Sequence, residues 1–344
     1  LRYATFPYAK QSLVLVENLT ERMLVDWKTH RVVWRQSAGI QDHTDWSPAS
    51  RATAYVRDHN LFVIDGEGRV RQISTDGSRE MVYGVTAYRE MFGIYKGTFW
   101  NPDGSRLAFY RMDQTMVPDY PLVDVDPDSM AVLAPEKYPM AGRTTHEVTI
   151  GVYDVKADKT IYLKVGNPKD RYFVNIGWSP DGKTIYLKEF NRKQNEMSLD
   201  AYDAVTGDKR ATLYTERHEK YITSYTSVAF LPWDADKFIL QSQKDGYNHL
   251  YLFNTKGEML RQLTSGNFVV YDLLGFDKAR KRAIILSAES SPIQSNLYAV
   301  DIATGKRTLL DNGRGVHANI ISPSGFHDRA LSPDGGWIID NYAE

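Results

Sequence analysis

Gly177-Trp-Ser-Pro-Asp-Gly182, or GWSPDG, is the clearest copy of a short pattern that recurs along the 344-residue chain. Each copy places an aromatic or apolar anchor residue before a turn, usually Pro-Asp-Gly, and an apolar run follows the turn. Successive anchors are 54, 78, 52, 46 and 55 positions apart, which indicates a repeat protein with a period of about fifty residues. The anchors are Trp46, Trp100, Trp178, Phe230, Phe276 and Leu331.

The chemistry of each repeat predicts short antiparallel strands. In Pro-Asp-Gly, Pro fixes φ at the first corner of a turn and Gly closes the turn. A second turn follows in residues 201–207, 250–257 and 297–305, where Asp or Asn starts the turn and Gly supplies a positive φ. Four short strands per repeat are typical of a β-propeller blade. A long β-sandwich also has regularly spaced strands, but the same turn at the same place in each repeat favours the propeller.

We therefore expect one all-β domain over residues 1–344, a β-propeller of four-stranded antiparallel blades. About seven blades are recognisable, and the first and last are expected to be incomplete. The anchor residues should pack blade against blade, because repeat units bury aromatic side chains between neighbours.

The 78-residue step contains an insertion at about residues 115–142, with five prolines between positions 118 and 139. Prolines at this density restrict a segment to extended or edge-strand conformations. We expect this insertion to leave the ring as an extended interaction arm.

Composition excludes several classes of function. Lys plus Arg (42) nearly balance Asp plus Glu (43), so no overall field draws the chain to nucleic acid. There are no cysteines, and the eight histidines show no ligand spacing, so no metal is expected. Glycine-rich phosphate loops are missing, and no cofactor is expected. No Gly-x-Ser-x-Gly nucleophile elbow occurs, so no catalytic residue is expected in these 344 residues.

Residues 92–114, FGIYKGTFWNPDGSRLAFYRMDQ, together with 138–142, YPMAG, resemble the N-terminal propeller of bacterial dipeptidyl peptidase IV. Residues 192–195 and 245–251 follow in the order that this family shows. The resemblance implies an eight-bladed propeller stacked on an α/β-hydrolase domain that releases dipeptides with proline, less often alanine, in second place. That second domain is absent from these residues, so this chain alone should be inactive.

The resemblance also implies a site, partners and a location. In the family, two glutamates just before the counterpart of Phe92 bind the N-terminal ammonium of a peptide. Here Glu90 occupies one of the two positions and Arg89 the other. The alternative for Glu90 is a solvated acid paired with Arg89 or Lys96. The family further implies a homodimer formed through the 115–142 arm and a periplasmic or secreted location.

Phe230 is a second candidate, because its family counterpart lines an extended substrate pocket next to an arginine. Leu231 stands in the place of that arginine, and packing between blades is the favoured reading of Phe230.

A different class of function remains open: a propeller used only for binding, as a scaffold for a protein or glycan partner. Propellers host many functions, so the fold does not decide between the two.

Overall fold

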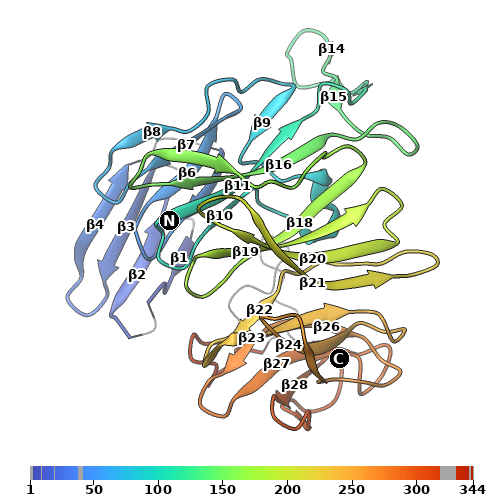
Figure 1. Ribbon diagram of the computed structural model, residues 1–344. Coiled ribbons are helices and arrows are strands. Elements are labelled where there is room, and N and C mark those ends of the chain that lie inside the picture. The colour runs from blue at the N-terminus through green and yellow to red at the C-terminus, as the bar shows by residue number, and fades with distance from the viewer. Residues whose placement is uncertain are drawn as a thin grey trace.

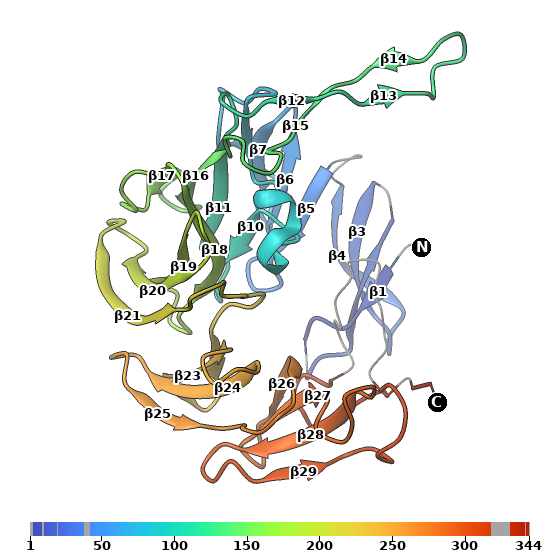
Figure 2. The same ribbon diagram turned by 90° about the vertical axis from the view of Figure 1, so that its right-hand side faces the viewer.

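The computed structural model describes residues 3–8, 10–18, 20–37, 42–317, 331–340 and 342–343 (Figure 1). Within these residues, six antiparallel sheets follow one another along the chain and stand around a common centre (Figure 2). Five sheets have four strands and the third has five, and within each four-stranded sheet the strands lie side by side in sequence order. The predicted all-β propeller of four-stranded antiparallel blades is confirmed.

The first three sheets lie within residues 3–162. The first contains β1 (Tyr3–Thr5), β2 (Leu13–Glu17), β3 (Glu21–Asp26) and β4 (Arg31–Ser37). The second contains β5 (Asp42–Trp46), β6 (Thr53–Arg57), β7 (Asn60–Ile64) and β8 (Val70–Gln72). The third contains β10 (Thr98–Trp100), β11 (Arg106–Asp113), β16 (Glu147–Asp154) and β17 (Lys159–Tyr162), and β9 (Met81–Tyr83) also pairs with β11.

The other three sheets are regular. The fourth contains β18 (Arg171–Trp178), β19 (Thr184–Asn191), β20 (Glu196–Asp203) and β21 (Lys209–Arg217). The fifth contains β22 (Ala229–Leu231), β23 (Asp234–Ser242), β24 (His249–Asn254) and β25 (Met259–Gln262). The sixth contains β26 (Val270–Asp277), β27 (Arg282–Ser287), β28 (Asn296–Asp301) and β29 (Arg307–Leu309). Beyond it, the last anchor, Leu331, forms an isolated bridge with Ile338.

The anchor residues end, or nearly end, the first strand of a sheet. Trp100 pairs with Leu107 and Trp178 with Ile185 on the second strand. The indole Nε1 of Trp100 donates to the backbone oxygen of Asp45 (3.0 Å), and that of Trp178 donates to the backbone oxygen of Phe99 (3.0 Å). Each acceptor directly precedes the anchor of the previous sheet. These two anchors therefore join neighbouring blades, as the sequence predicts.

The turn glycines also serve the contact between blades. Gly104 has a φ of 70°, which an L side chain rarely adopts. A Cβ at Gly104 would lie 2.4 Å from the Oγ atoms of both Ser47 and Ser50, in the turn of the second sheet. The Pro-Asp-Gly turn thus needs glycine both for its backbone conformation and for its close approach to the neighbouring blade.

Strand order divides the loops between two faces of the ring. Because strands are antiparallel, the turns joining first to second and third to fourth strands lie on one face. The links from second to third strands, and from sheet to sheet, lie on the other. This second face carries the 3-10 helix η1 (Tyr88–Gly93), the insertion at 115–142 and the link 222–228. We call it the helix face.

The insertion at 115–142 forms a long hairpin that projects away from the third sheet (Figure 2). Its two short ladders are β12 (Asp119–Tyr120) with β15 (Glu136–Lys137), and β13 (Val123–Asp124) with β14 (Val132–Leu133). At its base, Nη2 of Arg79 donates to Oδ1 of Asp119 (2.6 Å) and to the backbone oxygen of Pro135 (2.8 Å).

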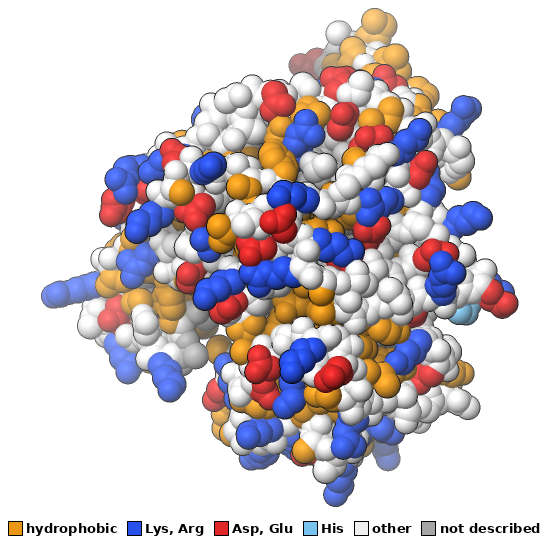
Figure 3. Space-filling view, viewed as in Figure 1, with side chains coloured by type: hydrophobic (Ala, Val, Ile, Leu, Met, Phe, Trp, Pro, Cys, Tyr) orange, Lys and Arg blue, Asp and Glu red, His pale blue; other side chains and the backbone are white. Residues whose placement is uncertain are grey.

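Figure 3 shows basic and acidic side chains interspersed over the face in view, in keeping with the near balance of charges in the sequence. In the described part of the chain, no helix has the length and apolar character needed to cross a membrane. In the same part, no group of three or more His, Asp or Glu side chains is arranged to hold a metal ion.

Candidate functional site

The helix η1 has an unusual backbone. Tyr88, its first residue, has a φ of 59°, and Phe92 has a φ of 66°. Bulky residues rarely adopt this left-handed conformation, and such strain persists only where the surroundings hold it in place. It is concentrated at functional sites. The helix η1, which contains Glu90, is therefore held by its neighbours in a backbone conformation that its own residues disfavour.

The start of η1 is held by His146, which directly precedes β16, and by Phe173 on β18 of the fourth sheet. The backbone N–H of Tyr88 donates to Nε2 of His146 (3.1 Å), and the two rings stack with centroids 5.2 Å apart. The backbone N–H of Phe173 donates to the Tyr88 hydroxyl oxygen (3.0 Å). Burial raises the pKa of Tyr88 above its usual range, so this hydroxyl stays neutral.

The end of η1 is held by the fourth sheet and by the link 222–228. Nδ2 of Asn175 donates to the backbone oxygen of Phe92 (2.9 Å), and the Phe92 ring packs on Phe190 with centroids 5.1 Å apart. Gly93, with a φ of 66°, lies so close to this link that a Cβ would be 2.6 Å from the backbone oxygen of Tyr225.

The backbones of Arg89 and Glu90 lie within η1, but their side chains lie outside the part of the structure that is described. The role assigned to these two residues stays a prediction. Lys96, the alternative partner for Glu90, forms an ion pair with Asp45, its Nζ lying 3.2 Å from Oδ2.

A cavity of about 630 Å³ lies beside the end of η1, at the centre of the sheets. The first strands of five sheets contribute to its wall, as do residues 93–96 after the helix and the link 222–228. Its polar and charged lining residues are Asp45, Lys96, Asn175, Thr226, Ser227, Gln241 and Asp272. We call it the central cavity. The remaining lining residues are mostly apolar or aromatic, so the cavity offers apolar surface together with charges of both signs and amide and hydroxyl groups.

Phe230 lies apart from the lining of this cavity, although its neighbour Ala229 contributes to it. The Phe230 ring packs between blades, against Tyr186 of the fourth sheet (5.2 Å between centroids) and Phe238 of its own sheet (5.6 Å). Its predicted role in substrate binding is untested by these contacts.

Sequence reasoning missed the residues that hold η1 and border the cavity, chiefly His146, Asn175 and Tyr225. The sequence could have indicated Asn175, because it is a lone polar residue in the apolar run 172–176. In the structure it lies at an irregularity of β18. No sequence pattern indicated His146 or Tyr225, since each lies in a link without a repeat pattern.

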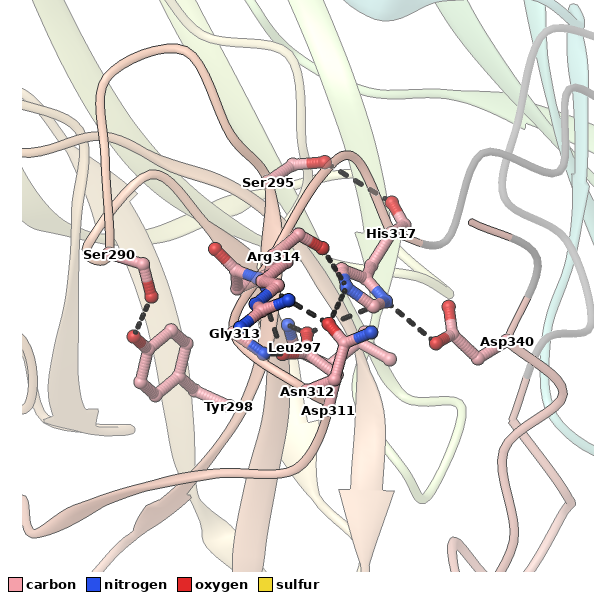
Figure 4. Close-up of polar contacts among 11 residues, drawn as sticks. Ser290, Ser295, Leu297, Tyr298, Asp311, Asn312, Gly313, Arg314, His317 and Asp340 are labelled. Carbon is pink, nitrogen blue, oxygen red and sulfur yellow. Dashed lines mark hydrogen bonds and ion pairs between the residues drawn. The ribbon is translucent and has the colours of Figure 1, made fainter. Parts of the chain in front are cut away.

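A second polar cluster lies away from the central cavity, at the end of the sixth sheet (Figure 4). Nδ1 of the buried His317 lies 2.7 Å from Oδ2 of Asp340 and 3.7 Å from Oδ2 of Asp311. Its Nε2 faces the backbone oxygen of Arg314 (2.6 Å) and Oδ1 of Asn312 (3.1 Å). Burial opposes the charged ring, but these acceptors and carboxylates outweigh it and raise the pKa of His317. The imidazolium thus ties residues 331–340 to the sixth sheet.

Comparisons with known proteins agree on one family. Residues 15–344 match the family described as "Dipeptidyl peptidase IV (DPP IV) N-terminal region". A probable dipeptidyl-aminopeptidase B of Talaromyces marneffei is 27% identical over 332 residues, covering 86% of this chain and 35% of that protein. A probable dipeptidyl peptidase 4 of Aspergillus flavus is 28% identical over 313 residues, covering 85% of this chain and 40% of that protein.

Solved structures give the same result. The crystal structure of a putative dipeptidyl aminopeptidase IV from Bacteroides ovatus is 36% identical with a TM-score of 0.84, and the match covers 98% of this chain and 48% of that one. The Porphyromonas gingivalis dipeptidyl peptidase 4 structure is 26% identical with a TM-score of 0.76, covering 89% and 45%. The chain spans less than half the length of each of these relatives.

Proposed function

Because this chain belongs to the family of dipeptidyl peptidase IV N-terminal regions, we propose that it is the substrate-gating propeller of a serine exopeptidase. That enzyme releases Xaa-Pro or Xaa-Ala dipeptides from peptides with a free N-terminus. The propeller itself supplies no nucleophile. Its task is to hold the amino end of the peptide while a C-terminal α/β-hydrolase domain of the same protein carries the catalytic serine.

The strained η1 beside the central cavity is the observation that carries this proposal. Glu90 belongs to η1, and this helix is fixed at both ends by buried contacts. A carboxylate on a rigid support at a cavity binds an ammonium by charge-assisted hydrogen bonds. It also discriminates, because a blocked amine leaves the carboxylate without a partner. In this arrangement Arg89 occupies the second position of the anchoring pair, and Phe230 supports the cavity wall through its neighbour Ala229.

The test uses the full-length protein that contains this chain and a chromogenic Gly-Pro substrate. Replacing Glu90 by Gln, which keeps the size and removes the charge, should lower kcat/KM by about tenfold to a hundredfold, the equivalent of losing one charge-assisted hydrogen bond. Glu80→Gln is a matched control, since Glu80 is a half-exposed acid on the same polypeptide stretch, paired with Arg79. Wild-type kcat/KM in the Glu90 variant would remove Glu90 from the site.

We also propose that the arm at 115–142 joins two copies of the protein. Its tip exposes apolar side chains to an extent unusual for a soluble protein, with Val125 at 75%, Met130 at 74% and Leu133 at 68%. Replacing these three residues by Ser should convert a dimer to a monomer in sedimentation velocity measurements, without changing the melting temperature. A dimer that survives the triple substitution would contradict this role.

We further propose that the partners of this chain are peptides with a free N-terminus and the hydrolase domain of the same protein. The location that we propose is periplasmic or secreted. Fractionation of cells that express the full-length protein tests the location directly. Recovery of the activity in the cytoplasmic fraction would contradict it.

A further inference from the structure

Lys188 is buried in the fourth sheet, on β19, with none of its surface exposed. A buried ammonium is costly, and burial lowers the pKa of Lys188 to about 8 although the carboxylate of Glu216 acts in the opposite direction. Glu216 lies too far away for an ion pair, since no ion pair joins the two among the described residues, and its Oε2 accepts from Ser242 (2.6 Å) and Tyr214 (3.1 Å). A charge kept in such a place needs an explanation other than stability.

A series of hydrogen bonds connects Lys188 to the end of η1, beside the central cavity. Its Nζ donates to Oγ of Ser224 (2.7 Å) and to the backbone oxygen of Thr226 (2.9 Å), both in the link 222–228. Oγ of Ser224 donates to Oδ1 of Asn175 (3.0 Å). Nδ2 of Asn175 then donates to the backbone oxygen of Phe92 at the end of η1 (2.9 Å).

The direction of every bond in this series is fixed from both of its ends, since the ammonium of Lys188 only donates and the backbone oxygen of Phe92 only accepts. An ammonium can only donate, so the Ser224 oxygen accepts from Lys188 and its hydrogen is left for Asn175. The Asn175 amide is then oriented with its oxygen toward Ser224 and its nitrogen toward Phe92. Without Lys188, Ser224 and Thr226 lose the donor that ties the link 222–228 to β19, so the position of the Ser224 hydroxyl that faces Asn175 is no longer fixed. Polarised series of this kind are stronger than isolated hydrogen bonds.

We propose that Lys188 is a positioning residue for peptide binding: through Ser224 and Asn175 it fixes η1, and with it Glu90, against the link 222–228 at the central cavity. This inference rests on the proposed function of Glu90. Lys188 touches neither the substrate nor the reacting atoms. Its effect reaches the peptide through the placement of the helix, so it should change binding of the amino end and leave the chemical step alone.

The experiment measures KM and kcat of the full-length protein with the Gly-Pro substrate, per titrated catalytic serine. Lys188→Met keeps the length of the side chain and removes the donors, and it should raise KM about tenfold with kcat within about twofold. Ser224→Ala should act in the same direction, and Ser224→Thr, which keeps the hydroxyl, should restore the wild-type KM. Lys183→Met is the matched control, because Lys183 is exposed in the turn before β19.

Glu90→Gln separates failure of this inference from failure of the proposed function. If Glu90→Gln raises KM while Lys188→Met and Ser224→Ala leave it unchanged, the positioning role is wrong and the function stands. If Glu90→Gln itself leaves KM unchanged, the anchoring function is wrong, and the role of Lys188 with it. The double variant Glu90→Gln/Lys188→Met tests whether Lys188 acts through Glu90. A KM no higher than that of Glu90→Gln alone supports action through Glu90. A KM raised by the product of the two single effects overturns it.

Because Ser224→Ala retains the lysine, it tests the proposal even if Lys188→Met does not fold. A purely structural lysine would lower the melting temperature and the titrated fraction of active enzyme, with KM per active site unchanged.

Discussion

At the scale of single residues, the sequence predicted what the repeat itself encodes. The anchors Trp100 and Trp178 and the turn glycine Gly104 stand where the pattern places them, because turn chemistry and aromatic packing are local properties. Lys188 could not be predicted. In the strand sequence Ile185-Tyr-Leu-Lys-Glu189, a lysine is ordinarily solvent-facing, and its burial depends on a link that lies more than thirty residues downstream.

The burial of Lys188 gives a prediction for stability against pH. The folded pKa, about 8, lies below the ordinary lysine value of 10.5, so between these pH values the folded lysine is neutral while the unfolded one still binds a proton. Stability of the wild type should therefore rise with pH in this window, by up to about 1.4 kcal/mol per pH unit, and level off on either side. Urea unfolding of wild type and Lys188→Met from pH 7 to 10.5 measures the difference. A constant difference would show that Lys188 titrates normally.

Gly104 gives a second prediction at this scale. Gly104→Ala introduces both a strained φ and a contact with Ser47 and Ser50 at 2.4 Å, and it should cost about 2–4 kcal/mol of unfolding free energy. Gly68→Ala is the control, because its φ of 89° is equally strained but no atom lies within 4 Å of the added Cβ. It should cost only about 1 kcal/mol. Equal losses in urea unfolding would contradict the role of Gly104 between blades.

At the scale of elements, the regular strands followed from the repeat, and the irregular ones did not. Residues 73–97 carry no repeat pattern, and there the structure forms β9 and η1. The resemblance indicated that Glu90 and Phe92 matter, but it gave no account of what holds them. That account comes from His146 and Asn175, which lie more than fifty and eighty residues away in sequence. Such long-range contacts leave little trace in a single sequence.

The indole hydrogen bonds between neighbouring sheets can be tested by comparing three Trp→Phe variants. Trp178→Phe removes the donor to the backbone oxygen of Phe99 and should lower the unfolding free energy by about 1–3 kcal/mol, since a partly buried acceptor loses its partner. Trp100→Phe should do the same at Asp45. In Trp233→Phe, the ring still packs on Phe276 and no hydrogen bond to a described residue is lost, so the change should be smaller. Similar losses in all three variants would refute the bonding role.

At the scale of the whole molecule, the propeller of four-stranded blades was predictable, but the attachment of the last described segment was not. Asp311 and His317 lie in one segment after β29, but Asp340 lies 23 residues beyond His317, and no motif links them. Their meeting depends on how residues 331–343 return to the sixth sheet, where Val316 and Ala343 pair. No local signal in the sequence specifies this return.

This attachment should weaken at alkaline pH. Because the folded pKa of His317 is raised above 6.5, its contribution is complete below pH 6.5 and is lost as pH rises through the folded pKa. Hydrogen exchange at the amides of Val316 and Ala343, corrected for intrinsic rates, should therefore speed up from pH 6 to pH 9. Asp340→Asn should reduce this dependence. Exchange that keeps the same protection across the range would exclude a charged His317 as the tie.

Each four-stranded sheet is made from one continuous stretch of chain, with its strands in sequence order. A ribosome releases the chain from its amino end, so a sheet can assemble as soon as its own stretch has emerged, before any later one exists. The unit of folding is then also a natural unit of gene duplication. Copies could be added or lost whole, and the width of the central space would change by steps while the local architecture of every remaining sheet stayed intact.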